Sequence, residues 1–194
     1  MNLSNLFNQK EETQKIYGVV VGIVTDNHDN EKLGRVKLKF PWRGVNGQSY
    51  WARIATLMAG KNRGTYFLPE VEDEVLVAFD RGDINRPYVI GALWNGVDKP
   101  PEANTDGRNN IRKIKSRSGH EIILDDSAGT EKITIKDKTE KNSIVIDSAQ
   151  NSITIESTMQ LKIKSQTIEI EAGANMTIKS GAALTIQGAM VKIN

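Results

Sequence analysis

Residues 121–194 read EIILDDSAGTEKITIKDKTEKNSIVIDSAQNSITIESTMQLKIKSQTIEIEAGANMTIKSGAALTIQGAMVKIN, and one small unit recurs nine times in this stretch. In each unit, two aliphatic residues flank a single, usually polar, residue. The starts of the units are 11, 11, 9, 8, 7, 8, 8 and 7 residues apart, so the spacing shortens toward the C-terminus. Residues two apart lie on the same side of a β-strand, and repetition at short spacing is typical of stacked strands. The sequence therefore predicts a rod of short strands, each with its aliphatic pair on one side. The units are Ile122-Ile123-Leu124, Ile133-Thr134-Ile135, Ile144-Val145-Ile146, Ile153-Thr154-Ile155, Leu161-Lys162-Ile163, Ile168-Glu169-Ile170, Met176-Thr177-Ile178, Leu184-Thr185-Ile186 and Val191-Lys192-Ile193.

Each unit offers too few aliphatic side chains to enclose a hydrophobic core within one chain. A β-solenoid made by a single chain would usually show a longer repeat, of about 18–25 residues, because it needs two or three faces per coil. Three identical chains related by cyclic symmetry would give every strand an equivalent buried face. We therefore expect residues 118–194 to form an intertwined triple-stranded β-helix in a homotrimer. The expected trimer core consists of Ile133, Ile135, Ile144, Ile146, Ile153, Ile155, Leu161, Ile163, Ile168, Ile170, Met176, Ile178, Leu184 and Ile186.

The composition of the chain changes near residue 95. All 11 aromatic residues lie before this position, and all five prolines lie at or before Pro101. Large aromatic side chains fill the irregular space of a globular core, whereas a narrow stack of strands takes aliphatic and small residues. We expect four segments: an N-terminal arm at 1–15, a globular domain at 16–95, a linker or neck at 96–117, and a shaft at 118–194.

The globular segment 16–95 contains short apolar runs separated by turn residues. Residues 35–40 read RVKLKF, an alternation typical of a half-buried strand. Two glycines in the run IYGVVVGIVT at 16–25 suggest the bends of a small barrel. About five or six strands with no convincing helix favour an OB-fold. The predicted fold class is all-β: an N-terminal OB-fold barrel followed by the trimeric β-helix.

The overall composition excludes several classes of protein. The formal net charge is +2, so no strong global field attracts nucleic acid or membranes. The chain has no cysteine, which excludes disulfides and cysteine-based metal sites. The sequence shows neither an apolar stretch of about 18 residues that could span a membrane nor a secretory signal. We expect the chain to be made in the cytoplasm.

Candidate catalytic and metal sites are weak. His28 lies in DNHDN, which lacks the spacing of a calcium loop and is interpreted as a polar turn. Ser118, His120 and Asp125 are residue types of a hydrolase triad, but their proximity in sequence carries almost no specificity. Residues 60–64 lack the spacing of a phosphate loop and are interpreted as a turn, and the acidic run 70–74 is interpreted as a solvated turn. We predict no catalytic, cofactor-binding or metal-binding residue, and no enzyme activity.

The basic run Arg108–Arg117 holds five cations and no acid. Beside an OB-fold barrel such a run could bind single-stranded nucleic acid. Because the whole chain is nearly neutral, a solvated or interfacial neck between barrel and shaft is the favoured interpretation.

Three ordered motifs resemble a known family: GIVTDNHDNEKLGRVKLKFPW, then SYWARIATLMAG, then GTYFLPEVEDEVLVAFDRGDINRPYVIGALWNG. They are similar to the OB-fold domain of contractile-tail spike proteins, which include phage baseplate assembly protein V and the type VI secretion spike VgrG. The following RNNIRKIKSRSGHEIILDDSAGTEKITIKD looks like the transition into the trimeric β-helix of that family. The resemblance covers about residues 16–194 and implies a homotrimeric puncturing spike.

Departures from the family pattern imply separate partners. The sequence has no hub domain before the barrel, so the resemblance implies a separate hub protein at the OB-fold end. It has neither a lysozyme-like domain nor the His-x-His motif of some phage spike tips, which implies a separate conical tip of the PAAR-repeat type. We expect this tip to dock on Met190, Val191, Ile193 and Asn194, where the strand stack ends on an apolar edge. Glu72 stands where the family often has glycine.

The leading hypothesis is a non-enzymatic central spike of a phage tail, tailocin or secretion system. It would dock to a hub, carry a tip, contact a target-cell membrane transiently, and be assembled into an injection particle. The expected partners include no nucleic acid. The main alternative is an OB-fold protein that binds single-stranded nucleic acid and trimerises through its tail; a carbohydrate-binding or hydrolytic tail fibre is a third possibility.

Overall fold

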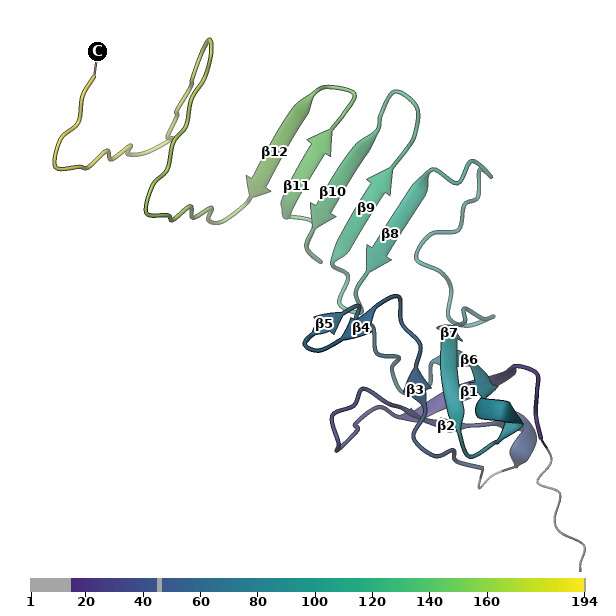
Figure 1. Cartoon of the computed structure of the whole chain (residues 1–194). Coiled ribbons are helices and arrows are strands. Elements are labelled where there is room, and N and C mark those ends of the chain that lie inside the picture. The colour runs from purple at the N-terminus through teal and green to yellow at the C-terminus, as the bar shows by residue number, and fades with distance from the viewer. Residues whose placement is uncertain (1–14, 45–46, 194) are drawn as a thin grey trace, which may run out of the picture. The chain divides into compact units, whose positions relative to one another are not determined.

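The computed structural model describes residues 15–44 and 47–193 and divides the chain into two units, Met1–Ala103 and Asn104–Asn194 (Figure 1). The expected N-terminal arm at 1–15 lies, except for its last residue, outside the described residues. The division after Ala103 falls within the segment 96–117 that the sequence predicts to be a linker. Apart from two 3₁₀ turns at Pro41–Arg43 and Asp80–Gly82, every element of the described residues is a β-strand.

The first unit is a five-stranded barrel. Its strands are β1 (Val20–Asp26), β2 (Lys37–Lys39), β3 (Arg53–Ile54), β6 (Glu74–Phe79) and β7 (Pro87–Ala92), hydrogen-bonded in the order β2-β1-β6-β7-β3. Only the β3–β7 pair is parallel. The sheet closes through a bridge between Val36 and Ala52, whose two backbone N–H···O contacts measure 3.0 and 2.7 Å. A small closed barrel of this kind confirms the OB-type prediction.

Alternating side chains build the core of the barrel. In RVKLKF, Val36, Leu38 and Phe40 are buried and alternate with three basic residues that are only half-buried. Strand β6 repeats the pattern, with Val75, Val77 and Phe79 inside. Gly22 lies where β1 crosses this core, and an added Cβ would make a tight contact of 3.1 Å with Val77 Cγ2. The full core is Val24, Val36, Leu38, Phe40, Ala52, Val75, Val77, Phe79 and Val89.

A hairpin arm extends from the barrel between β3 and β6. We define the arm as residues 55–67; it contains the short strands β4 (Ala59–Gly60) and β5 (Arg63–Gly64). The Gly64 backbone has a φ of +148°, and an added Cβ would lie 2.4 Å from the Met58 carbonyl oxygen. Glycine is therefore required at this position. The turn predicted at residues 60–64 forms the tip of the arm.

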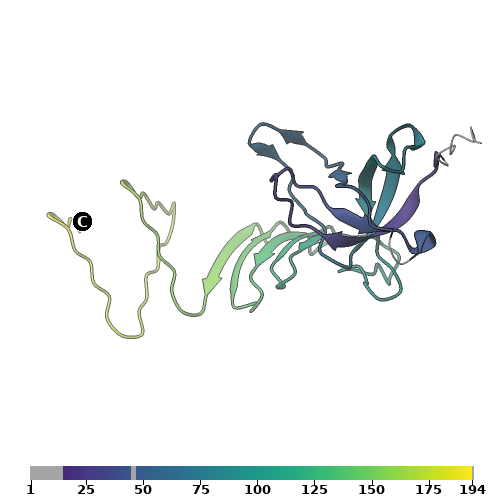
Figure 2. The ribbon, with the colours of Figure 1, turned by 90° about the horizontal axis from the view of Figure 1, so that it is seen from below.

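The second unit begins with an antiparallel five-stranded sheet, the pale green arrows of Figure 2. Each strand pairs with its sequence neighbour in the order β12-β11-β10-β9-β8. The bounds are β8 (Ile111–Lys115), β9 (Glu121–Asp125), β10 (Lys132–Lys136), β11 (Asn142–Asp147) and β12 (Ser152–Ser157). The first four repeat units are therefore strands, as predicted. Strand β8 lies within the segment 96–117 that the sequence predicts to be a linker or neck.

The last five repeat units differ from the prediction, because residues 158–193 form no strand in this single chain. Spacing gives the physical reason. The turns between β9, β10, β11 and β12 span 126–131, 137–141 and 148–151, so they shorten as the repeat shortens. A strand of five residues with a turn of four needs nine residues, and the later units start only 7 or 8 apart. The later units are therefore too short to repeat the strand-and-turn pattern of β9–β12.

Three aspartates cap the turns of this sheet: Asp125 and Asp147 end β9 and β11, and Asp137 directly follows β10. The Asp125 carboxylate accepts a hydrogen bond from the Ser127 N–H at 2.9 Å, and the Asp147 carboxylate accepts one from the Gln150 N–H at 2.8 Å. Asp137 accepts hydrogen bonds from the Thr139 hydroxyl and from Asn142, and these bonds lower its pKa to about 2, the Asn142 side chain being the largest cause. Side-chain acceptors of this kind satisfy backbone donors that the sheet leaves unpaired.

Candidate functional site: an unpartnered aliphatic face

One face of the β8–β12 sheet is almost entirely aliphatic. The strand registers align its side chains into two rows across the sheet. The first row is Ile114, Ile122, Ile135, Ile144 and Ile155. The second row is Leu124, Ile133, Ile146 and Ile153, and it begins at Arg112 on β8. We call these nine side chains the aliphatic face.

The aliphatic face is open in the single chain. Its members are 40–70% exposed, although branched aliphatic side chains are among those most often buried in proteins. Large contiguous apolar patches mark surfaces that bind another molecule. The opposite face carries Lys113, Ile123, Thr134, Val145 and Thr154 in one row, with charged residues on both sides. The two faces therefore differ in polarity, and only the aliphatic face lacks rows of polar and charged side chains.

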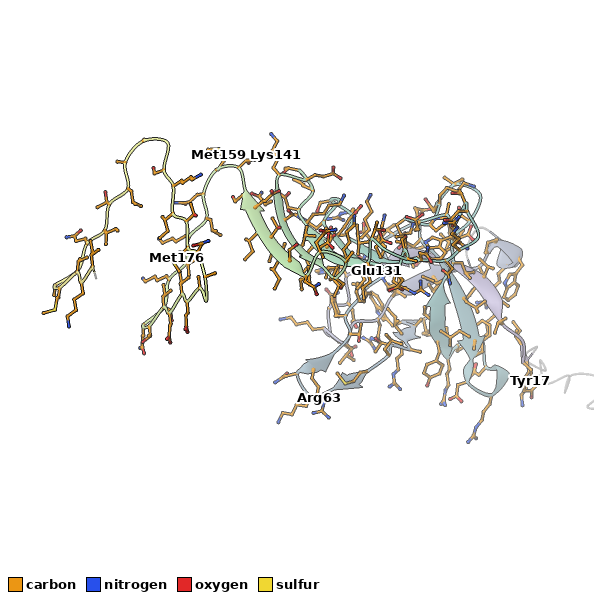
Figure 3. The ribbon with its side chains drawn as sticks, turned by 90° about the horizontal axis from the view of Figure 1, so that it is seen from above. Tyr17, Arg63, Glu131, Lys141, Met159 and Met176 are labelled. Carbon is orange, nitrogen blue, oxygen red and sulfur yellow. The ribbon has the colours of Figure 1, made fainter. Side chains whose placement is uncertain are left out.

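Six of the fourteen residues predicted for a trimer core lie on the aliphatic face: Ile133, Ile135, Ile144, Ile146, Ile153 and Ile155. The remaining eight, from Leu161 to Ile186, lie in the part without strands and are 49–70% exposed (Met176 is labelled in Figure 3). The prediction of core residues missed Ile114, Ile122 and Leu124. Ile122 and Leu124 belong to the first repeat unit, but Ile114 is recognisable only by its register opposite Ile122.

Among the residues predicted for tip docking, Met190, Val191 and Ile193 are 75, 50 and 89% exposed. Asn194 lies outside the described residues.

A charged row crosses β8, β9 and β10 at one end of the polar face. Glu121 is only 7% exposed, and its carboxylate lies 2.9 Å from Lys115 Nζ and 3.4 Å from Lys136 Nζ. Lys136 Nζ also lies 2.7 Å from the Glu140 carboxylate. The hydrogen bond from Lys115 lowers the pKa of Glu121, and the charges of Lys113 and Lys136 act in the same direction. The hydrogen bond to Glu140 raises the pKa of Lys136.

Glu121→Gln should make the stability of the second unit less dependent on pH. A carboxyl whose pKa is lower in the folded than in the unfolded state stabilises the fold at pH values above its unfolded-state pKa. This contribution is lost as the pH falls through the folded-state pKa. We therefore expect the unfolding temperature of the natural protein to decrease as pH falls below about 4.5, the ordinary value of a glutamate. The variant should have a lower unfolding temperature at pH 7 and a flatter profile in acid, measured by circular dichroism. Equal slopes for the two proteins in acid would contradict this role of Glu121.

The weak catalytic and metal candidates do not come together. Asp125 ends β9 and caps a turn, whereas His120 precedes the other end of β9, where its Nδ1 accepts the Lys138 N–H at 3.3 Å. His28 donates its backbone N–H to Asp26 in a turn at 2.8 Å. Within residues 15–44 and 47–193, no group of three potential metal ligands forms.

No described helix has the length and apolarity to cross a membrane.

The basic run Arg108–Arg117 is largely neutralised by its own chain. Arg108 pairs with Asp106 at 3.9 Å, Arg112 with Asp126 at 3.6 Å, and Lys115 with Glu121 at 2.9 Å. A nucleic-acid site needs cations free to neutralise phosphates, so these pairs weigh against the nucleic-acid alternative.

The outer face of the barrel also pairs its aromatic rings within the chain. Lys37 Nζ lies 4.8 Å from the centre of the Trp51 ring, and the Arg53 guanidinium lies 5.7 Å from that of Tyr88. The cations lie over these two rings, whereas Trp42, Tyr50 and Trp94 are exposed.

Comparison with known proteins identifies the barrel. Residues 20–94 match the family described as the type VI secretion system/phage-baseplate injector OB domain. This range begins with β1 and ends just after β7, so the match corresponds to the closed barrel.

The curated relatives extend the similarity beyond the barrel. The type VI secretion system spike protein VgrG1a of Pseudomonas aeruginosa is 30% identical over 142 residues, which cover 68% of this chain and 22% of that protein. VgrG1b of the same organism is 32% identical over 135 residues, covering 64% of this chain and 18% of the relative. The actin cross-linking toxin VgrG1 of Vibrio cholerae is 25% identical over 169 residues, covering 82% of this chain and 14% of the relative.

The chain spans about a fifth or less of the length of these relatives. Their names describe spike proteins and, in one case, a toxin, so the prediction that this chain has no enzyme activity stays a prediction. The resemblance drawn from the sequence is confirmed: the chain carries the injector OB domain and is a relative of the VgrG-like baseplate spike proteins.

Proposed function

We propose that this chain forms the non-enzymatic central spike of a contractile injection apparatus, as a homotrimer. The observation that carries the proposal is the aliphatic face, an apolar sheet surface that residues 15–44 and 47–193 of its own chain leave open. Three copies related by a threefold axis would turn these faces toward one another and bury them. Each side chain would then gain part of the roughly 1.5–3 kcal/mol that full burial of such a residue provides.

The shaft would consist of two sections. In the first, residues 111–157, each chain supplies one preformed wall, because its five strands already pair with one another. In the second, residues 158–193, the repeat is too short for the strand-and-turn pattern of β9–β12 and the single chain forms no strand, so the strands would pair with those of the other two copies. This is the section to which the intertwined triple-stranded β-helix applies.

Partners follow from the same arrangement. The barrel end would dock to a separate hub protein, and a PAAR-like tip would dock on the exposed Met190, Val191 and Ile193. The particle that contains the spike would bring it to the target-cell membrane. A rod of stacked strands suits this role, because force along its axis loads many hydrogen-bonded layers together and neighbouring chains hold each layer in place.

The mass of the protein in solution tests the proposal. Sedimentation equilibrium should give about three times the chain mass of 21.5 kDa, with no monomer at micromolar concentration. A monomer under these conditions would contradict the trimeric spike, and a stable dimer would contradict the threefold arrangement.

A further inference from the structure

The hairpin arm at residues 55–67 is apolar and exposed. Leu57 is 95% exposed, Tyr66 76% and Phe67 68%, while Met58 is about half exposed. An open groove of about 1080 Å³ lies between the arm and the adjacent barrel surface. On the barrel side, its lining includes Val89–Ala92 of β7. A hairpin with two residues per strand is not stable by its own pairing in water. Its apolar side chains therefore need a partner.

The charge of this surface limits what that partner can be. The arm and the groove lining contain Lys32, Lys61 and Arg63 and no acidic residue. Within the described part of the chain, no carboxylate lies within ion-pair distance of Lys61 or Arg63. Arg63 lies at the tip of the arm (Figure 3). Three arms meeting tip to tip on a threefold axis would bring like charges together, so a contact between arms is disfavoured.

The chain carries a matching surface in the acidic turn at residues 70–74, which read EVEDE. Val71 is 50% exposed there, and the Glu72 side chain is 69% exposed beside Lys39, 3.1 Å away. Glu72 has a φ of 77°, a left-handed conformation that non-glycine residues rarely adopt. An exposed aliphatic side chain flanked by acids complements an apolar groove flanked by cations.

We propose that the arm of one copy docks on the acidic turn of the next copy around the trimer. Val71 would enter the apolar groove, and Glu72 would face Lys61 or Arg63. A contact between two different patches closes into a ring when the rotation is threefold. This inference rests on the proposed trimer and adds a second interface, located in the barrels and separate from the shaft.

Cross-linking between introduced cysteines tests the contact, because the chain has no cysteine of its own. The full chain carrying both Arg63→Cys and Glu72→Cys is treated with a short bis-maleimide and run on a denaturing gel. We expect covalent trimers, since each copy offers one thiol to each neighbour. The variant with Arg63→Cys alone and the variant with Glu72→Cys alone should remain chiefly monomeric on the gel.

Three other outcomes would contradict the docking contact or the proposed function. Covalent dimers from the Arg63→Cys variant alone would show that arms meet arms, against the proposal. The absence of cross-links in the double variant, when it sediments at three times the chain mass, would refute the docking contact and leave the trimer standing. Sedimentation of the double variant and of the natural protein as monomers would instead overturn the proposed function itself.

Discussion

Ile155→Asp should leave the protein monomeric, whereas Thr154→Asp should leave the trimer intact. The two residues are neighbours on β12, and their side chains lie on opposite faces of the sheet. In the proposed trimer, the first substitution places three carboxylates inside the shaft at one level. Burial of an unpaired charge costs several kcal/mol, and the like charges add to this cost. The second substitution adds only exposed charge.

Sedimentation equilibrium of both variants provides the measurement, with thermal unfolding followed by circular dichroism. We expect the Ile155→Asp variant near the chain mass of 21.5 kDa and the Thr154→Asp variant at about three times this value. A stable trimer of the Ile155→Asp variant would show that the aliphatic face does not point into the shaft. An equal loss of trimer in the Thr154→Asp variant would show that any charge on this strand prevents trimer formation, whichever face of the sheet carries it.

Phe40→Ala should destabilise the barrel by about 3–5 kcal/mol, which is a large part of the stability of a small domain. The Phe40 ring is 1% exposed, and its centre lies 5.6 Å from the centres of both the Phe79 and Trp42 rings. Truncation would remove both ring contacts and leave a cavity in the core of the barrel.

Denaturant unfolding followed by tryptophan fluorescence isolates this effect, because Trp42, Trp51 and Trp94 all lie in the first unit. Tyr50→Ala is a suitable control, since it also truncates an aromatic side chain but at a position 67% exposed. It should change the free energy of unfolding by less than about 0.5 kcal/mol. Equal losses in the two variants would mean that Phe40 is not a central residue of the core.

The sequence predicted the elements whose patterns are local. Alternation in RVKLKF placed Val36, Leu38 and Phe40 in the barrel core, and the aliphatic pairs placed the strands β9 to β12. Both patterns depend only on the period of two in a strand, which the residues themselves display.

The features that the sequence did not predict depend on contacts with distant residues. Strand β8 lies in a stretch rich in basic residues, and it becomes a strand because its register places Ile114 beside Ile122. The arm was predicted only as a turn at 60–64, because its exposed aromatic residues look the same in sequence as core residues. The spacing of the last five units did contain a signal, since 7 or 8 residues cannot hold a strand of five and a turn of four.

The meander of β8–β12 has a consequence for the order of events in assembly. Every strand pairs with its neighbour in sequence, so loop-closure costs are small and such local contacts form quickly. We expect each wall to fold on a single chain soon after its synthesis, before three copies meet. Association would then begin between finished walls, whose matching rows of isoleucine set the alignment of the three chains. Residues 158–193 would then pair between the three copies, starting at residue 158 and proceeding toward the C-terminus. Only the first encounter would depend on protein concentration.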